Sequence, residues 1–215
     1  MLAAASAAWV WMLALPDPQA RAHSHAGHGT SGGHELLGLG LMVVGMMLPL
    51  TVPSVRYAAH SRLRRTNCAI AAFVAGYLAV WMAAMAVLAA AWQAVAALGG
   101  GTGAAIGMIA AAVLWEAAPP KRDALRRCRL TPPLAPRGWR ADADCVRFGA
   151  RTGARCVAAC WALMAACVAF AHSLPVMAAL FAIQLSGRYS RRASPALAAA
   201  AVLGVCLTAL ALRMP

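Results

Sequence analysis

Long apolar runs that are almost free of charged residues constrain the fold of this chain more than any other feature. Hydrophobic residues make up 62% and charged residues 12% of the sequence, whereas a soluble domain carries roughly 45–50% and about 25%. A membrane-spanning helix needs roughly 17–25 mostly apolar residues. We therefore predict an all-α, polytopic transmembrane helical bundle of about six helices, formed by the runs at approximately 36–53, 67–92, 103–118, 153–172, 174–186 and 195–212.

The basic residues define a membrane topology. The net charge is +13, and nearly all Lys and Arg fall in alternate gaps between the runs, at 54–66, 119–155 and 187–194. The positive-inside rule makes these gaps cytoplasmic, which places the Gly99–Gly101 turn and the His172–Pro175 turn outside. We therefore attribute the positive charge to membrane topology and to attraction for anionic lipid, and we expect no nucleic-acid site.

Two parts of this topology stay open in the sequence. Residues 1–22 form an apolar N-terminal segment that is either an uncleaved span or a signal peptide ending at Ala20-Arg21-Ala22. The absence of a basic residue before Leu2 favours the uncleaved span. Residues 153–186 form either a helical hairpin broken near Pro175 or a re-entrant segment. The remaining chain is predicted as an outer segment, 23–35, and a membrane domain, 36–215, with a cytoplasmic basic loop at 119–152.

The outer segment is rich in histidine. Its four imidazoles lie among Gly, Ser and Ala, which cannot pack a core, and such a tract is a compositional signal for metal binding. Neutral imidazole suits Cu, Zn, Ni and Fe. A flexible polar linker that happens to contain histidine is the alternative. The candidate ligands are His23, His25, His28 and His34.

A stripe of sulfur atoms is predicted inside the membrane domain. At about 100° per residue, Cys156, Cys160, Met164 and Cys167 fall within roughly 80° of one another on a helix. Thiolates and thioethers are soft ligands that suit Cu(I). The alternative is packing, since Cys and Met are also common in helix contacts.

A second pair of thioethers lies in the first apolar run of the membrane domain. Met42 and Met46 are spaced to share a helical face, bordered by Gly38 and Gly45. Small residues of this kind allow another helix to approach closely. We predict that both methionines line a path for a soft cation, and the alternative is again packing.

Catalytic motifs are missing from the sequence. It contains no Gly-x-Ser-x-Gly, no phosphate-binding Gly-x-x-x-x-Gly-Lys-Ser/Thr and no pair of intramembrane carboxylates. The loop 119–152 is too short and too rich in proline for an enzyme domain. We therefore expect that the protein is not an enzyme.

Three blocks resemble the predicted metal-binding integral membrane proteins, a bacterial family of unknown function whose members are sometimes labelled copper chaperones. The first resembles the family's Ala-Met-Met-Leu-Pro signature and the helix after it, and the third its Cys-x-x-Cys-Cys-Trp-Ala-Leu-Met. The second resembles a stretch with Thr-Pro-Leu-Lys and Cys-Leu-x-x-Cys-Arg. In this chain the blocks are Met46-Met47-Leu48-Pro49 with Gly76-Tyr77-Leu78 and Trp81; Trp115-Glu116 through Pro119, Lys121 and Cys128-Arg129; and Cys156 through Met164.

This chain departs from the family pattern at candidate ligand positions. Ala124 and Ala159 stand where the pattern has Cys, and Glu116 stands where Gln is usual. The family's Gly-x-Met-Asn is replaced by 171–174, so His172 is a candidate substitute ligand.

The resemblance implies a bacterial plasma (inner) membrane protein that binds a copper ion. Its expected role is metal delivery, transfer across the membrane or metalloprotein maturation, with a metalloprotein or metal-handling partner. The alternative function is a metal-free membrane assembly subunit whose small residues, such as Gly38 and Gly45, bind partner helices. The sequence defines no oligomeric state.

Overall fold

The chain folds into helices joined by short connections. A computed structural model describes residues 6–7, 10, 31–61, 66–97, 101–128, 130–135, 139–170, 173–189 and 194–211. Every regular element among these residues is helical, which confirms the all-α prediction. The question of cleavage after residue 22 lies outside the described residues, as do His23, His25, His28 and His172, while His34 is described only as part of a helix backbone.

Each of the six predicted apolar runs is helical over most of its described residues. Three stretches, Gly38–His60, Thr66–Val95 and Trp139–Ala169, are long and apolar enough to cross a membrane. The other three runs correspond to shorter helices. The elements are α3 (Ser31–Met47), η1 (Pro49–Thr51), α4 (Val52–His60), α5 (Thr66–Ala97), α6 (Gly101–Ala117), α7 (Pro119–Arg127), α8 (Trp139–Ala169), α9 (Leu174–Tyr189) and α10 (Pro195–Ala211).

The region predicted as the basic loop 119–152 is largely helical. It forms α7 and the first part of α8, which begins at Trp139. Ala141, Cys145, Phe148 and Thr152 are all buried in this part of α8. Their spacing of three or four residues is the period of one helical face, so the helix continues through charged sequence.

The apolar stretch 153–186 is interrupted between two helices. Helix α8 ends at Ala169 and α9 begins at Leu174. Pro175 is the second residue of α9, where its missing N–H and fixed φ cost the helix little. The break predicted near Pro175 is therefore confirmed.

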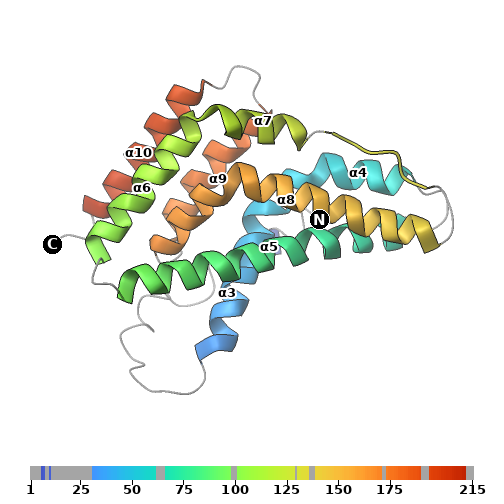
Figure 1. Cartoon of the computed structure of the whole chain (residues 1–215), viewed down its shortest axis with the longest axis horizontal. Coiled ribbons are helices and arrows are strands. Elements are labelled where there is room, and N and C mark those ends of the chain that lie inside the picture. Colours follow the sequence, from blue (N-terminus) through green and yellow to red (C-terminus); the bar gives the residue numbers. More distant parts are fainter. Residues whose placement is uncertain are drawn as a thin grey trace.

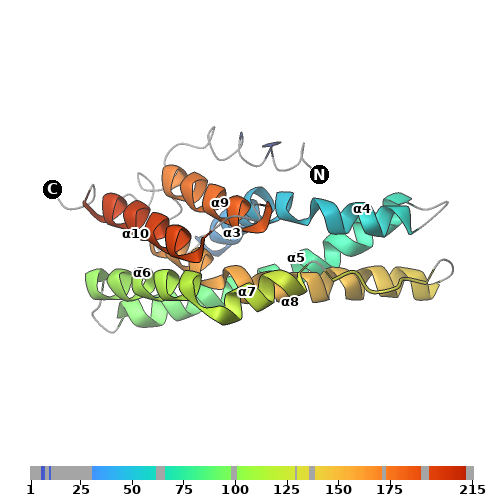
Figure 2. The same cartoon turned by 90° about the horizontal axis from the view of Figure 1, so that it is seen from above.

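Helices α5 and α8 form the most extensive pairing of the structure and lie side by side in both views (Figures 1 and 2). Glycine allows this close approach. A Cβ at Gly76 would lie 2.3 Å from the Val146 carbonyl oxygen, and one at Gly149 would lie 2.0 Å from that of Phe73. Gly153 lies one turn further along α8, where a Cβ would be 3.1 Å from the Tyr77 carbonyl oxygen. Backbones that pack this closely are typical of small-xxx-small interfaces in membranes.

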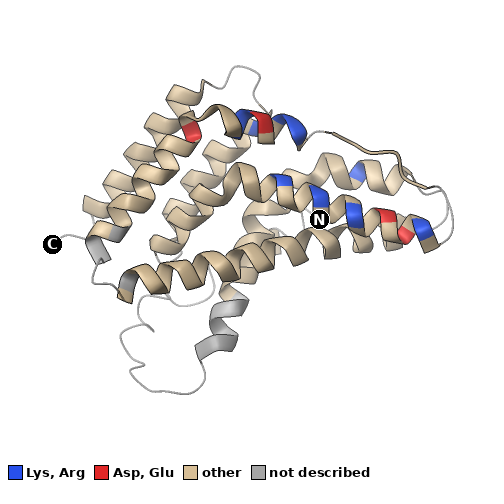
Figure 3. Ribbon diagram, viewed as in Figure 1, with Lys and Arg blue, Asp and Glu red and all other residues tan. Residues whose placement is uncertain are grey.

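The exposed apolar side chains and the charged side chains lie mostly on different helices or different parts of a helix. Large apolar side chains on α5, α6 and α10 point outward, among them Val87, Leu114 and Leu197. Helices α3, α5, α6 and α10 contain no Lys or Arg, and the described basic residues lie mainly on α4, α7 and the first half of α8 (Figure 3). This distribution suits helices that contact lipid and basic ends that lie in water.

Candidate metal centre

The predicted sulfur stripe faces the protein interior. Cys156 and Cys160 lie one turn apart on α8, with exposed fractions of 1% and 4%. Met164 and Cys167 continue the stripe and are completely buried. All four belong to the main hydrophobic core. A lipid-facing stripe would be exposed in this structure, so the thiols are directed at other helices.

Tyr77 connects the stripe to two other helices. Its hydroxyl lies 3.3 Å from the Cys156 Sγ and 3.3 Å from the Met47 carbonyl oxygen. A phenol has one proton to donate. It can donate to Met47 while accepting from the Cys156 thiol, or donate to Cys156 once that group is a thiolate. In the sequence, Tyr77 stands out only as part of the first block of the family resemblance.

Cys128, at the end of α7, is a third thiol at this site. It is buried and interacts electrostatically with Cys156, and burial raises its pKa to about 11. Cys128 also interacts with Cys160. Cys128, Cys156 and Cys160 are called the thiol cluster below. Helical spacing did not identify Cys128 as a ligand, although it lies in the second block of the family resemblance.

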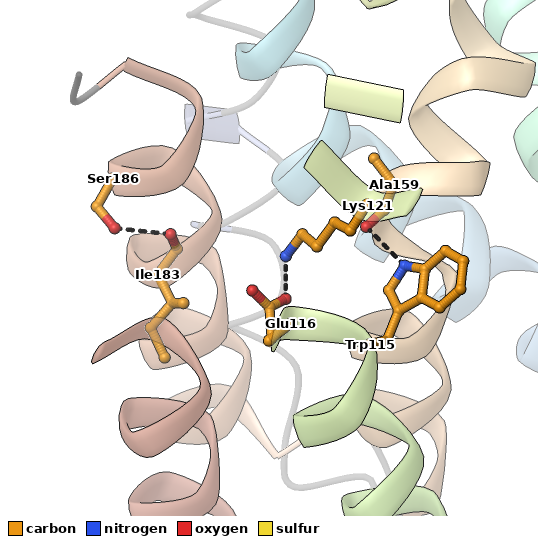
Figure 4. A network of polar contacts seen from close by, with 6 residues as sticks. All are labelled: Trp115, Glu116, Lys121, Ala159, Ile183 and Ser186. Atoms are coloured by element: carbon orange, nitrogen blue, oxygen red, sulfur yellow. Dashed lines mark hydrogen bonds and ion pairs between the residues drawn. The ribbon is translucent and has the colours of Figure 1, made fainter. Parts of the chain in front are cut away.

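Charged and aromatic groups from α6 and α7 lie near the thiol cluster, and Figure 4 shows two of their contacts, the Glu116–Lys121 ion pair and the hydrogen bond from Trp115 to Ala159. Glu116 and Lys121 form a buried ion pair, and Lys121 also interacts electrostatically with Cys160. The Trp115 indole N–H donates to the Ala159 carbonyl oxygen at 3.3 Å. Its ring packs edge-on against Trp161, with 5.4 Å between the two ring centroids. These contacts fix the start of α7, and so Cys128, against α8.

The three sequence blocks thus meet at one place. Met47 and Tyr77 come from the first block, and Cys128 from the second. Cys156 comes from the third block, where its Sγ lies 3.3 Å from the Tyr77 hydroxyl and it interacts electrostatically with Cys128. Because these residues are far apart in the sequence, their meeting is a property of the fold.

The predicted methionines and small residues are placed as follows. Met42, Met46 and Met164 are completely buried in the same core as the thiol cluster. The link from α3 to Cys156 is made instead by Met47, whose carbonyl oxygen accepts a hydrogen bond from the Tyr77 hydroxyl. A Cβ at Gly38 would meet nothing within 4 Å. Within the described part of the chain no other helix comes close to Gly38, and its role towards a partner helix stays a prediction.

The described residues contain no group of three or more His, Cys, Asp or Glu side chains arranged to hold a metal ion, so Cys128, Cys156 and Cys160 are not placed to bind one ion together. A tetrahedral zinc site of Cys and His ligands needs four such groups. Soft sulfur ligands from Cys and Met are the set that selects Cu(I).

Comparison with known families agrees with this chemistry. A family model described as copper chaperone matches residues 36–214. The chain belongs to the copper chaperone family. No curated protein and no solved structure matches it. The family match includes Cys128, Cys156 and Cys160 and begins after His34.

Proposed function

We propose that this copper chaperone family member binds Cu(I) within the membrane through Cys156 and Cys160. The observation that carries the proposal is the position of these thiols. They lie one turn apart on the buried face of a helix long enough to cross a membrane, beside a third thiol and the Tyr77 hydroxyl. Soft sulfur ligands on an apolar span suit Cu(I) and exclude the hard ions Mg²⁺ and Ca²⁺.

Ligand exchange is the mechanism that this arrangement supports. Cu(I) binds to Cys156 and Cys160 as thiolates, so the two thiols lose their protons as the ion binds. Cys128 supplies a further sulfur at the end of α7, and Met46 and Met164 lie in the same core. A new sulfur can bond to the ion before an earlier one leaves, so copper moves between ligands without becoming free.

A direction for this exchange follows from the membrane placement that we propose. We propose that it lies in the bacterial plasma membrane with α7 and the basic end of α8 in the cytoplasm, as the positive-inside rule requires. His23, His25, His28 and His34 then capture copper outside. The ion passes to the thiol cluster and from there to a metalloprotein or metal-handling partner. In this role the protein carries a metal ion and catalyses no reaction.

Anaerobic titration of the detergent-purified full chain with Cu(I), against a competing Cu(I) chelator, tests the proposal. The parent should bind copper stoichiometrically, and the Cys156→Ser/Cys160→Ser variant should lose this binding while keeping its helical circular dichroism. Cys68→Ser/Cys145→Ser is the matched control, because it removes one exposed and one buried thiol and leaves the thiol cluster intact.

Two results would decide between this function and a metal-free assembly subunit. Loss of copper in the thiol-cluster variant alone supports metal handling. A variant with all four histidines changed to Ala shows how much copper the rest of the chain binds. If that variant binds no copper, the sulfur stripe serves packing and the assembly function replaces the proposal.

A further inference from the structure

A small pocket lies between α8 and the stretch of chain that joins it to α7. Its volume is about 120 Å³, whereas about 10–15 Å³ is enough to hold one water molecule. The pocket therefore has room for a group as large as a phosphate. Three of its lining residues come from the joining stretch and three from α8: Leu130, Thr131, Pro132, Phe148, Arg151 and Arg155.

Hydrogen bonds hold the walls of this pocket in place. The Tyr57 hydroxyl donates to the Pro132 carbonyl oxygen at 2.9 Å, which fixes the joining stretch from the side of α4. Arg155 Nη1 donates to the carbonyl oxygens of Arg127 at 3.0 Å and Leu130 at 3.4 Å, which fixes the same stretch from the side of α8. The pocket is thus formed before any ligand binds, and this lowers the entropic cost of binding.

The pocket is positively charged. Its six lining residues, all of which the structure describes, include two arginines and no Asp or Glu. Arg151 is exposed, and the two bonds of Arg155 to carbonyl oxygens come from Nη1 alone. A guanidinium carries five N–H donors in a fork that matches the oxygens of phosphate. The Arg151 side chain and the Nε and Nη2 groups of Arg155 are therefore suited to bind an anion.

The position of the pocket along α8 corresponds to the surface of a membrane. Residues 156–187 contain no Asp, Glu, Lys or Arg, so Arg155 is the last charged residue before the apolar part of α8. Basic residues at such a boundary lie at the level of the lipid headgroups. Leu130 on the pocket wall is 57% exposed, and an exposed apolar side chain at this level is suited to contact the first carbons of an acyl chain.

We propose that this pocket binds a phosphate group and that the headgroup of an anionic phospholipid supplies it. Arg151 and Arg155 bind the phosphate oxygens, and Leu130 contacts the lipid chain. Basic pockets of this kind on the cytoplasmic side of membrane proteins bind anionic headgroups. A phosphate ion in solution carries the same group, so the experiment has to separate the two sources. The inference does not depend on copper binding, because none of the lining residues is a proposed copper ligand.

Thermal unfolding of the full chain in a neutral detergent tests the inference. A ligand that binds the folded protein stabilises it by an amount that depends on its concentration and its dissociation constant. Titration with phosphatidylglycerol, with phosphatidylcholine and with inorganic phosphate therefore gives an apparent dissociation constant for each. We expect phosphatidylglycerol to bind most tightly. Each variant is compared with itself in the absence of ligand, so a change in its intrinsic stability does not enter the result.

Arg151→Gln is the decisive variant, because Arg151 lines the pocket and is exposed. It should weaken phosphatidylglycerol binding by about 10–100-fold, the loss expected for a hydrogen bond to a charged group. Arg147→Gln is the matched control, since it removes the same charge from an exposed position one turn earlier on α8 that does not line the pocket. It should cause only the smaller loss that comes from screened attraction to the surface.

Three results would decide the matter. Tighter binding of phosphatidylglycerol than of inorganic phosphate, with the large loss confined to Arg151→Gln, supports the headgroup as the ligand. If inorganic phosphate binds as tightly and depends on Arg151 in the same way, the phosphate site stands and the lipid source is overturned. Equal losses in Arg151→Gln and Arg147→Gln would overturn the site, because they show attraction to the basic surface as a whole. None of these results bears on the copper titration, so the two proposals fail independently.

Discussion

Replacing Gly149 by alanine tests the structure where its two main helices are closest. The new Cβ would lie 2.0 Å from the Phe73 carbonyl oxygen, 2.8 Å from the Phe73 carbonyl carbon and 3.1 Å from its Cα. These are backbone atoms of a helix, so no side chain can rotate away to make room. The helices would have to separate by about 1.4 Å before the closest pair reached an ordinary contact of 3.4 Å.

The cost of that separation can be worked out approximately. Overpacking a core typically costs about 1–3 kcal/mol, and a gap of about 0.5–1 Å removes a quarter to a half of each van der Waals contact that it opens. Because α5 and α8 share the largest interface, we place the cost at the upper end, about 3 kcal/mol. The better helix propensity of Ala returns about 1 kcal/mol. The net loss of about 2 kcal/mol lowers the melting temperature by roughly 4–8 °C.

Thermal unfolding in detergent, followed by circular dichroism, measures this loss. Gly204→Ala is the matched control, because a Cβ at Gly204 in α10 meets nothing within 4 Å. It should gain about 1 kcal/mol from helix propensity and raise the melting temperature by roughly 2–4 °C. If Gly149→Ala proved as stable as Gly204→Ala, the close approach of α5 and α8 would be refuted.

Three further predictions concern the surroundings of the thiol cluster. Tyr77→Phe removes the hydroxyl shared by two partners and should cost about 1–2 kcal/mol of unfolding free energy, measured by the same melting assay. Glu116→Gln leaves the buried Lys121 ammonium without its carboxylate and should cost about 3–5 kcal/mol; adding Lys121→Met should recover most of the lost stability. The raised pKa of Cys128, about 11, keeps this thiol protonated at neutral pH. Its alkylation rate, followed by mass spectrometry, should rise about tenfold per pH unit from 7 to 10, since only the thiolate reacts, and a rate that levels off near pH 8 would contradict the raised pKa.

The sequence predicted the apolar helices of the membrane domain. It did not predict that the charged residues at the start of α8 also form a helix. A chain in hydrocarbon must satisfy its backbone hydrogen bonds within a helix, so the apolar runs marked the helices directly. The first part of α8 contains Arg140, Asp142, Asp144 and Arg147, and this polarity indicated a loop. Its buried face became clear only when α5 was seen to cover it.

The candidate site was predictable along one helix and not between helices. Periodicity shows that Cys156 and Cys160 share a face, and the structure confirms that this face is buried. Periodicity says nothing about which helix lies opposite, so neither the contact of Tyr77 with Cys156 nor the electrostatic interaction of Cys128 with Cys156 could be derived. The spacing of Gly149 and Gly153 was a signal for close helix packing that the sequence analysis did not use.

One face of α8 serves both helix packing and the thiols. Gly149, Gly153, Cys156 and Cys160 are spaced by four, three and four residues, so the glycines that admit α5 and the cysteines that meet Tyr77 share that face. A change that forces the helices apart at Gly149 should therefore also lengthen the contact between Tyr77 and Cys156 and weaken copper binding. Replacing the cysteines should remove copper and leave the packing unchanged. A metal-free assembly subunit would show the first loss of stability without any copper dependence, so measuring stability and copper affinity on the same variants separates the two functions.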